Sequence, residues 1–253
     1  MKLDKHYTDP RLVELYDHDN PRGADTDFYL TLAAELNAQR IIDLGCGTGL
    51  LTCELATGQR QIIGIDPSPA MLAVAQRKPE AERVEWVVGD ASILGERNAD
   101  LLTMTGNVAQ IFLDDADWAA TLCHIHKVLR PGGYVAFESR NPTARAWEQW
   151  GRDETFEEIE TPFGSMACWL EVLDVQDGQV HFVGHNLFKA TGEDVAAYST
   201  LRFRSHTELA DSLRQAGFTV DRVYGDWHHG AFTDTSRLMI FVARRNEPAE
   251  KTV

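Results

Sequence analysis

The clearest indication of the fold is the stretch Ile41-Ile-Asp-Leu-Gly45-Cys-Gly47-Thr-Gly49-Leu-Leu51. It has the pattern of a short buried strand that ends in three closely spaced glycines and continues into a helix. Because glycine has no Cβ, the backbone of such a turn can approach a ligand that side chains would exclude, and the following helix presents free N–H groups there. The stretch therefore predicts a ligand-binding turn at the end of a strand.

The spacing of the glycines indicates which ligand the turn suits. A dinucleotide-binding loop has the pattern Gly-x-Gly-x-x-Gly, whose third glycine would fall on Leu50. Here the third glycine is Gly49, and Asp43 lies two residues before the first. An acid at that position suits a positively charged group, such as the ammonium of a bound amino acid, directly or through water, and does not suit a pyrophosphate. A NAD(P)-dependent oxidoreductase is disfavoured but stays an alternative.

Apolar runs on both sides of this stretch predict the rest of the sheet. From about residue 40 to 140, short β-branched runs alternate with longer helical patterns; the runs are 41–44, 62–65, 84–88, 101–104 and 134–137. Strands separated by helices are typical of a parallel sheet covered on both faces. Two further strands are expected at 219–224 and 237–243. The chain thus predicts a doubly wound, mostly parallel seven-stranded α/β sheet.

Local signals place the helices between these strands. Ser68 can cap a helix whose first residue is Pro69, and Asp115 or Asp117 can open a helix that runs to Leu129. Near the C-terminus, Ser205-His-Thr-Glu208 is a capping box, and Gly217 suits the end of that helix.

Residues 143–204 interrupt the α/β pattern. Three antiparallel strands are expected at 166–175, 179–190 and 195–204, the first two joined by the hairpin turn Asp177-Gly178. We therefore predict a core of residues 1–142 and 205–245, an antiparallel insertion at 143–204 that covers the substrate, and a flexible tail at 246–253. Replacing 155–198 by a linker is expected to leave cofactor affinity within roughly a few-fold. The same strands could instead form a dimerisation surface, which makes a homodimer the alternative.

Acidic residues follow the predicted strands on either side of the glycine turn. Asp43 precedes the glycines, Asp66 ends the second strand, and Asp90 follows the third in Gly89-Asp90-Ala91. A carboxylate at the end of the second strand can accept both hydroxyl protons of a ribose, and one after the third can accept from an adenine amino group. Because the carboxyl ends of parallel strands meet at one edge, the three acids together indicate a nucleoside site.

The segment from about 41 to 140 resembles the class I (Rossmann-like) S-adenosylmethionine-dependent methyltransferases. The matching stretches are Asp43-Leu-Gly-Cys-Gly-Thr-Gly49, Gly64-Ile-Asp66-Pro-Ser-Pro-Ala-Met71-Leu, Gly89-Asp90-Ala91 and Leu129-Arg-Pro-Gly-Gly133. The resemblance implies an enzyme that uses S-adenosyl-L-methionine. A protein that binds this cofactor without catalysis stays an alternative, because methyl transfer needs no invariant catalytic side chain.

The resemblance also implies roles for individual residues. Gly45 and Gly47 would line the methionine part of the cofactor, Asp66 the ribose, and Asp90 with Ala91 the adenine. An aromatic residue of an N-terminal helix would cover it, for which Tyr16 is the first choice and Tyr7 the second. The full set of expected cofactor contacts is Tyr16, Asp43, Gly45, Cys46, Gly47, Gly49, Asp66, Pro67, Met71, Asp90, Ala91, Thr105, Gly106 and Asn107.

The acceptor side departs from known subfamilies. After the fourth strand the chain reads Thr105-Gly-Asn-Val108, without the Asn/Asp-Pro-Pro-Tyr/Phe motif of amino-group methylation on DNA bases or glutamine. No catalytic residue is assigned; Arg140 could hold a substrate carboxylate, and a histidine could act as a base. The catalytic candidates are Asn107, Arg140, His185 and His228, and residues expected near the acceptor also include Glu138, Asn141, Trp147 and Trp150.

Charge and composition limit the partners. Thirty-nine acidic against 24 basic residues give a net charge of −15, which disfavours nucleic acid and favours a small molecule or a basic protein surface. The expected acceptor is an oxygen or nitrogen atom of a small molecule. No apolar run approaches the ~20 residues of a membrane span, and the N-terminus lacks a secretory pattern, so a cytoplasmic protein is expected. The four cysteines are scattered, which predicts reduced thiols and no metal site.

Overall fold

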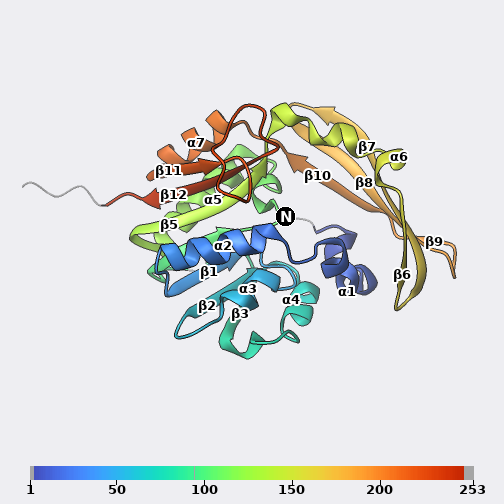
Figure 1. The fold of residues 1–253 in the computed structure, drawn as a ribbon, viewed down its shortest axis with the longest axis horizontal. Helices are drawn as coiled ribbons and strands as arrows, with labels where there is room; N and C mark the ends of the chain where they lie inside the picture. Colours follow the sequence, from blue (N-terminus) through green and yellow to red (C-terminus); the bar gives the residue numbers. More distant parts are fainter. Residues whose placement is uncertain (1–2, 94, 248–253) are drawn as a thin grey trace, which may run out of the picture.

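The computed structural model describes residues 3–93 and 95–247. Its main sheet has seven strands in the order β11-β12-β5-β4-β1-β2-β3 (Figure 1). These strands are β1 (Arg40–Leu44), β2 (Gln61–Asp66), β3 (Val84–Val88), β4 (Ala99–Met104), β5 (Leu129–Arg140), β11 (Phe218–Tyr224) and β12 (Leu238–Arg245). The strands β1 to β5 pair in parallel, whereas β12 pairs antiparallel with β5 and with β11. The predicted doubly wound, mostly parallel seven-stranded sheet is confirmed.

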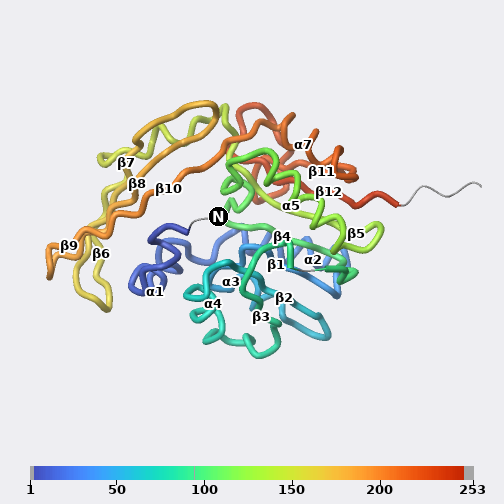
Figure 2. Tube along the Cα trace, turned by 180° about the vertical axis from the view of Figure 1, so that it is seen from behind, coloured from blue at the N-terminus to red at the C-terminus, as the bar shows by residue number. Residues whose placement is uncertain are grey.

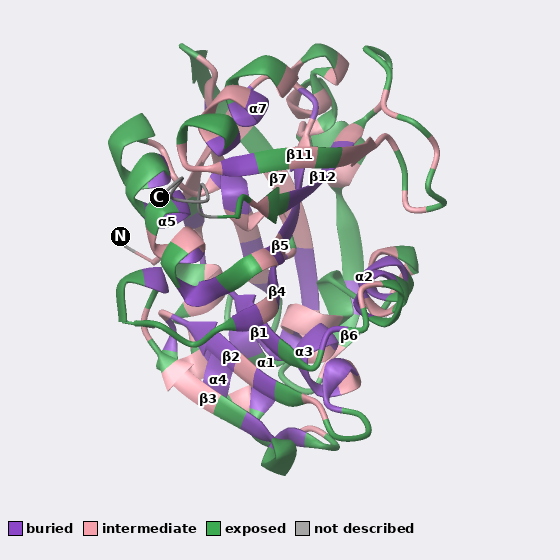
Figure 3. Cartoon of the chain, turned by 90° about the vertical axis from the view of Figure 1, so that its left-hand side faces the viewer, coloured by how far each residue is buried: buried purple, intermediate pink, exposed green. Residues whose placement is uncertain are grey.

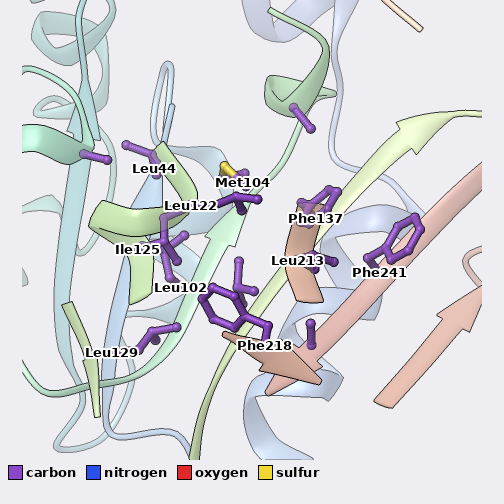
Figure 4. Close-up of a cluster of buried hydrophobic side chains, with 14 of the residues drawn as sticks. Leu44, Leu102, Met104, Leu122, Ile125, Leu129, Phe137, Leu213, Phe218 and Phe241 are labelled. Atoms are coloured by element: carbon purple, nitrogen blue, oxygen red, sulfur yellow. The ribbon is translucent and has the colours of Figure 1, made fainter. Parts of the chain in front are cut away.

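Helices cover both faces of this sheet. The helices α5 (Asp115–Val128) and α7 (His206–Gln215) pack on one face, where Leu122 and Leu213 meet Phe137 and Phe241 of the strands (Figure 4). The helices α2 (Ala24–Glu35) and α3 (Leu50–Leu55) pack on the other. Figure 3 shows how completely the central strands are buried between these layers. A strand buried on both faces needs apolar residues throughout, which explains the continuous runs in the sequence.

The predicted helix starts are observed. Ser68 caps α4 (Pro69–Ala75) by accepting from the Met71 amide, and the capping box of Ser205 and Glu208 opens α7. The helix α5 begins at Asp115, one of the two predicted opening residues, and Asp114 at the position before it forms no side-chain capping bond. Asp115 and Asp117 both lie in its first turn, where the helix dipole stabilises a negative charge.

A second, antiparallel sheet follows β5. It consists of β6 (Glu157–Thr161), β7 (Gly164–Gln176), β8 (Gln179–Phe188), β9 (Glu193–Asp194) and β10 (Ala197–Arg202). At the turn between β7 and β8, Asp177 and Gly178 have φ of 50° and 73°, as a two-residue hairpin requires. The sequence did not predict β6, because its residues other than Ile159 are polar and it lies at the edge of the sheet.

The N-terminal segment, residues 3–20, lies between the two sheets. It contains the short helix η1 (Lys5–Tyr7) and the helix α1 (Pro10–Asp19). Figures 1 and 2 show α1 between the second sheet and α4. Among the described residues, no helix is long and apolar enough to cross a membrane. Residues 248–253 of the predicted tail lie outside the described residues.

Candidate cofactor and acceptor site

Glycine is needed for different structural reasons at the three positions after β1. All are left-handed, with φ of 76°, 55° and 74° for Gly45, Gly47 and Gly49. A Cβ at Gly45 would lie 2.5 Å from Val108, and one at Gly49 would lie 2.6 Å from the ring of Trp86. At Gly47 the nearest atom would be a ring carbon of Tyr16, at 4.0 Å. Gly45 and Gly49 are therefore required by close packing within the protein, whereas Gly47 leaves room for a ligand.

The helix α1 is fastened to this turn. The hydroxyl of Thr48 donates to Asp17, which also pairs with Lys78 of the segment after α4. The rings of Tyr7 and Tyr16 lie 6.1 Å apart, and the Ser68 hydroxyl donates to the carbonyl of Tyr7 at 2.6 Å. The structure therefore brings both candidate tyrosines to the glycine turn. Burial, together with the charge of Asp66, raises the pKa of Tyr16 to about 12, so its hydroxyl stays protonated.

Asp66 links the turn after β1 to the turn after β2. One carboxylate oxygen accepts from the Gly47 amide at 2.9 Å, and the other accepts from the Ser68 amide at 2.8 Å. Burial raises the pKa of Asp66, and the two amides oppose this shift. The carboxylate thus lies beside the open position at Gly47, where a ligand can reach it.

Asp43 lies beneath the glycine turn and is 1% exposed. Its oxygens accept from the hydroxyls of Thr52 at 2.6 Å and Thr103 at 2.9 Å. Burial raises its pKa to about 6, although both hydroxyls favour the ionised form. Asp43 would therefore act on a bound ammonium only by the electrostatic attraction of its charge across the turn, and not by direct contact.

The raised pKa of Asp43 makes a testable prediction about stability. Between about pH 4 and pH 6, we expect the free energy of unfolding to fall relative to that of Asp43→Asn as the pH rises. In this window the folded carboxyl keeps a proton that the unfolded chain has lost, so raising the pH favours unfolding. The difference between about 6 and 3.8 corresponds to about 3 kcal/mol. Urea denaturation of both proteins across this range is the measurement; a constant difference contradicts the prediction.

The ends of β2 and β3 lie side by side, because Asp66 pairs with Val88. Asp90 follows β3 on the surface, and one of its oxygens accepts from the Ser92 amide at 2.9 Å. The large apolar side chains of Val88 and Ile93 are exposed next to it, and the predicted contacts Met71 and Ala91 are buried nearby. Exposed apolar surface beside an acid suits a flat base with an amino group.

The ends of β4 and β5 are joined by a buried carboxylate. Glu138, 3% exposed, accepts from the hydroxyl of Tyr29 at 2.5 Å and from the amide of Asn107 at 2.6 Å. Asn107 is left-handed, with φ 63°, so this bond fixes the turn Thr105-Gly106-Asn107. Burial raises the pKa of Glu138. The sequence did not reveal Tyr29, which lies in α2 with no motif around it.

Arg140 ends β5 beside a group of aromatic rings. Its Nη1 donates to the side-chain oxygen of the buried Gln110 at 3.0 Å, and its guanidinium carbon lies 5.3 Å from the centre of the Trp150 ring. The Trp150 ring lies 5.0 Å from Phe182 and 6.1 Å from Phe203. Burial lowers the pKa of Arg140. Within the described chain, no carboxylate oxygen lies within 4.0 Å of its guanidinium nitrogens, so its charge has no direct partner.

Three other candidates do not join this group. Side chains alternate along β8, so His185 projects from the face opposite to Phe182; it binds Asp194 at 2.6 Å and stacks on Trp169. His228 is exposed in the turn after β11. The Asn141 amide donates to the carbonyls of Asp234 and Ser236 and so holds that turn. The structure therefore does not bring His185, His228 and Asn141 to the group around Arg140.

Comparison with known proteins agrees with this geometry. Residues 41–133 match the family model described as a methyltransferase domain. A protein named as a methyltransferase from Geobacillus sp. (strain WCH70) is 28% identical, over 82% of this chain and 85% of its own. The chain is a class I S-adenosylmethionine-dependent methyltransferase. The enzyme's cofactor is therefore S-adenosyl-L-methionine, as the sequence predicted, and the oxidoreductase alternative is wrong.

Solved structures share the fold of the methyltransferase over nearly its whole length. An S-adenosylmethionine-dependent methyltransferase from Clostridium acetobutylicum ATCC 824 has a TM-score of 0.76 at 16% identity, over 92% of this chain and 97% of that one. The sugar N-methyltransferase KedS8 from Streptoalloteichus sp ATCC 53650 has a TM-score of 0.73 at 19% identity, over 92% of both chains. The second sheet is thus included in the shared fold.

Proposed function

We propose that the methyltransferase methylates an oxygen or nitrogen atom of a small organic molecule. The observation that carries the proposal is the group formed by Arg140, Trp150 and Phe182 beside the turn at Asn107. Aromatic rings around a few polar groups are typical of small-molecule sites. The net charge of −15 and the fold shared with a sugar N-methyltransferase support the same class of acceptor.

The contacts proposed for the cofactor follow from the geometry after β1 to β4. The open position at Gly47, the carboxylate of Asp66 and the ring of Tyr16 fit the methionine and ribose parts, with Asp43 acting from beneath. We assign the adenine to the surface at Asp90. The remaining proposed contacts are Gly45, Cys46, Gly49, Pro67, Met71, Ala91, Thr105, Gly106 and Asn107.

The proposed chemistry depends on positioning rather than on a base. The cofactor supplies a methyl group on a sulfonium, and transfer is an in-line displacement that correct placement alone can accelerate strongly. Two of the buried carboxylates near the site, Asp43 and Glu138, each have both oxygens bound by side chains or by the backbone of the turns. We therefore propose that both carboxylates hold the turns and that neither accepts a proton from the acceptor.

Turnover measurements test the proposed acceptor class. The protein is incubated with S-adenosylmethionine and a panel of small amines, phenols, alcohols and carboxylic acids, and S-adenosylhomocysteine is quantified by mass spectrometry. We expect turnover with an amine or hydroxyl acceptor and a product that has gained one methyl group on nitrogen or oxygen. Methylation confined to carbon acceptors, to protein or to nucleic acid would overturn the proposal.

Asp66→Ala tests the assigned ribose contact. We expect it to weaken the binding of S-adenosylhomocysteine by about 1.5–3 kcal/mol, the range for losing hydrogen bonds to a charged group. Asp100→Ala is the matched control. Asp100 also accepts from two backbone amides, at 2.9 Å each, but it lies at the amino ends of the strands β1 and β4, away from the glycine turn. Calorimetry on both variants is the measurement. Equal affinity in the Asp66 variant and the unmodified protein would remove Asp66 from the site.

A further inference from the structure

Arg140 is an arginine whose surroundings take up little of its hydrogen-bonding capacity. A guanidinium carries five N–H donors in a planar fork, and among the described residues its one side-chain hydrogen bond goes to a neutral amide, that of Gln110. The nearest buried acid, Glu138, is already bound by Tyr29 and Asn107 and forms no ion pair with Arg140. A cation held in a partly buried, aromatic environment without an anion is unfavourable unless a ligand supplies one.

We infer that Arg140 binds a carboxylate of the acceptor, and that the acceptor is a small molecule with one negative charge and a flat apolar body. This inference rests on the proposed function and specifies its substrate class. Arginine and carboxylate match in a two-bond, fork-to-fork geometry. Arg140 is a binding residue in this scheme, and Gln110, which is fully buried and bonded to its Nη1, fixes the direction of the fork.

The charges around Arg140 favour a single carboxylate over a phosphate. Glu138 lies two residues before Arg140 on β5, and a more distant acid, Asp66, ends β2 at the same edge of the sheet. Both would repel a second negative charge. The basic side chains of Arg202 and Arg204 are engaged by Glu208 and Asp115, respectively. One guanidinium can neutralise one charge, which is what a carboxylate carries at neutral pH.

The aromatic rings beside Arg140 define the body of the acceptor. Trp150 lies under the guanidinium, and Phe182 and Phe203 continue the apolar surface on the second sheet and the segment after it. Trp147 closes the group edge-on against Phe203, with ring centres 4.7 Å apart. Such rings present flat faces that suit a planar or ring-shaped molecule.

The other source of a carboxylate is the methionine part of the cofactor. Arg140 lies at the end of β5, and its contacts come from Gln110, which follows β4, and from Trp150 after β5. The glycine turn belongs instead to β1, on the other side of β4 in the sheet. This placement favours the acceptor, and the test below separates the two sources.

The test uses benzoate and benzamide, which have nearly the same shape and differ in charge. Binding of each to the protein saturated with S-adenosylhomocysteine is measured by ligand-observed NMR or calorimetry. We expect benzoate to bind at least about ten-fold more tightly than benzamide. Arg140→Met should abolish the preference and Arg140→Lys should keep part of it, with S-adenosylhomocysteine affinity changed less than about two-fold in both.

Arg237→Met is the matched control, because Arg237 is also bonded to a glutamine side chain, that of Gln149 at 2.9 Å, but is exposed. It should keep the benzoate preference, and thermal unfolding shows that each variant is folded. The inference is overturned if benzoate shows no preference over benzamide, if neither binds, or if the preference survives Arg140→Met. A ten-fold or greater loss of S-adenosylhomocysteine affinity in Arg140→Met would assign Arg140 to the cofactor instead.

Failure of turnover with every amine and hydroxyl acceptor counts against the proposed function, whereas turnover without a benzoate preference counts against this inference alone.

Discussion

Replacing Glu138 by alanine is expected to lower the free energy of unfolding by about 3–5 kcal/mol and to remove most methyl transfer. The substitution leaves the Tyr29 hydroxyl and the Asn107 amide without their acceptor, and Glu138 and Tyr29 are both buried. It also opens a void at the end of β5. Asn107 has a left-handed backbone, which is unfavourable for a residue other than glycine. Within the part of the chain that the structure describes, the bond to Glu138 is the only side-chain hydrogen bond that holds this turn. Urea denaturation and turnover are the measurements.

The Glu138→Gln variant separates the role of Glu138 in positioning the turn at Asn107 from its contribution to the free energy of unfolding. Its side-chain oxygen can still accept from the Asn107 amide, while its NH2 group can donate to the Tyr29 oxygen, so we expect a loss of only about 1–2 kcal/mol. Tyr29→Phe removes the other half of the pair and should leave the turn at Asn107 in place. If Glu138 positions this turn for transfer, Glu138→Ala lowers kcat while the folded enzyme still binds S-adenosylhomocysteine within about two-fold. Activity that only follows the folded fraction would show a purely structural role.

The fold could be predicted because its signals are local. Strands buried on both faces must be apolar throughout, so β1, β2, β4 and β5 each appeared as a run of apolar residues. The edge strand β3 is less buried but was visible through its run Val84-Glu-Trp-Val-Val88. The close packing at Gly45 and Gly49 makes glycine obligatory there, which is why the turn was visible in the sequence. The strand β6 was missed for the opposite reason. An edge strand with one buried side chain, Ile159, carries no such run.

The site could be predicted only where its residues follow a strand directly. Asp66 and Asp90 became candidates because Asp66 ends β2 and Asp90 lies two residues after β3. Tyr29 and Gln110 were missed, since the pairing of Tyr29 with Glu138 joins positions 109 residues apart and no spacing rule connects them. The sequence could not place His185, because period-two alternation shows that Phe182 and His185 face opposite sides of β8, but not which side faces the core.

Nothing in the sequence indicated a contact between the N-terminal helix and the inserted strands, but in the structure they pack against each other. Leu12 and Leu15 of α1 share one apolar cluster with Met166 and Phe188 of the second sheet, and Ile159 and Val195 complete it. The same helix carries Tyr16, and its Asp17 accepts from Thr48 of the glycine turn. Replacing 155–198 by a linker would therefore remove the packing partner of α1, so the expectation that cofactor affinity survives this deletion no longer follows.

Met166→Ala tests this connection with a single substitution far from the glycine turn. Met166 is fully buried in the shared cluster, so we expect a loss of about 2–5 kcal/mol in the free energy of unfolding. We also expect S-adenosylhomocysteine to bind about ten-fold more weakly, because a loosened α1 no longer holds Tyr16 against Gly47 and must be ordered again on binding. Val180→Ala is the control: Val180 is equally buried in the second sheet but does not belong to the cluster with α1. Calorimetry well below the unfolding temperature, with limited proteolysis of residues 10–19 as a second measurement, compares the two variants. Equal affinities would show that the second sheet supports the acceptor side alone and that α1 holds its place through Thr48 and Lys78.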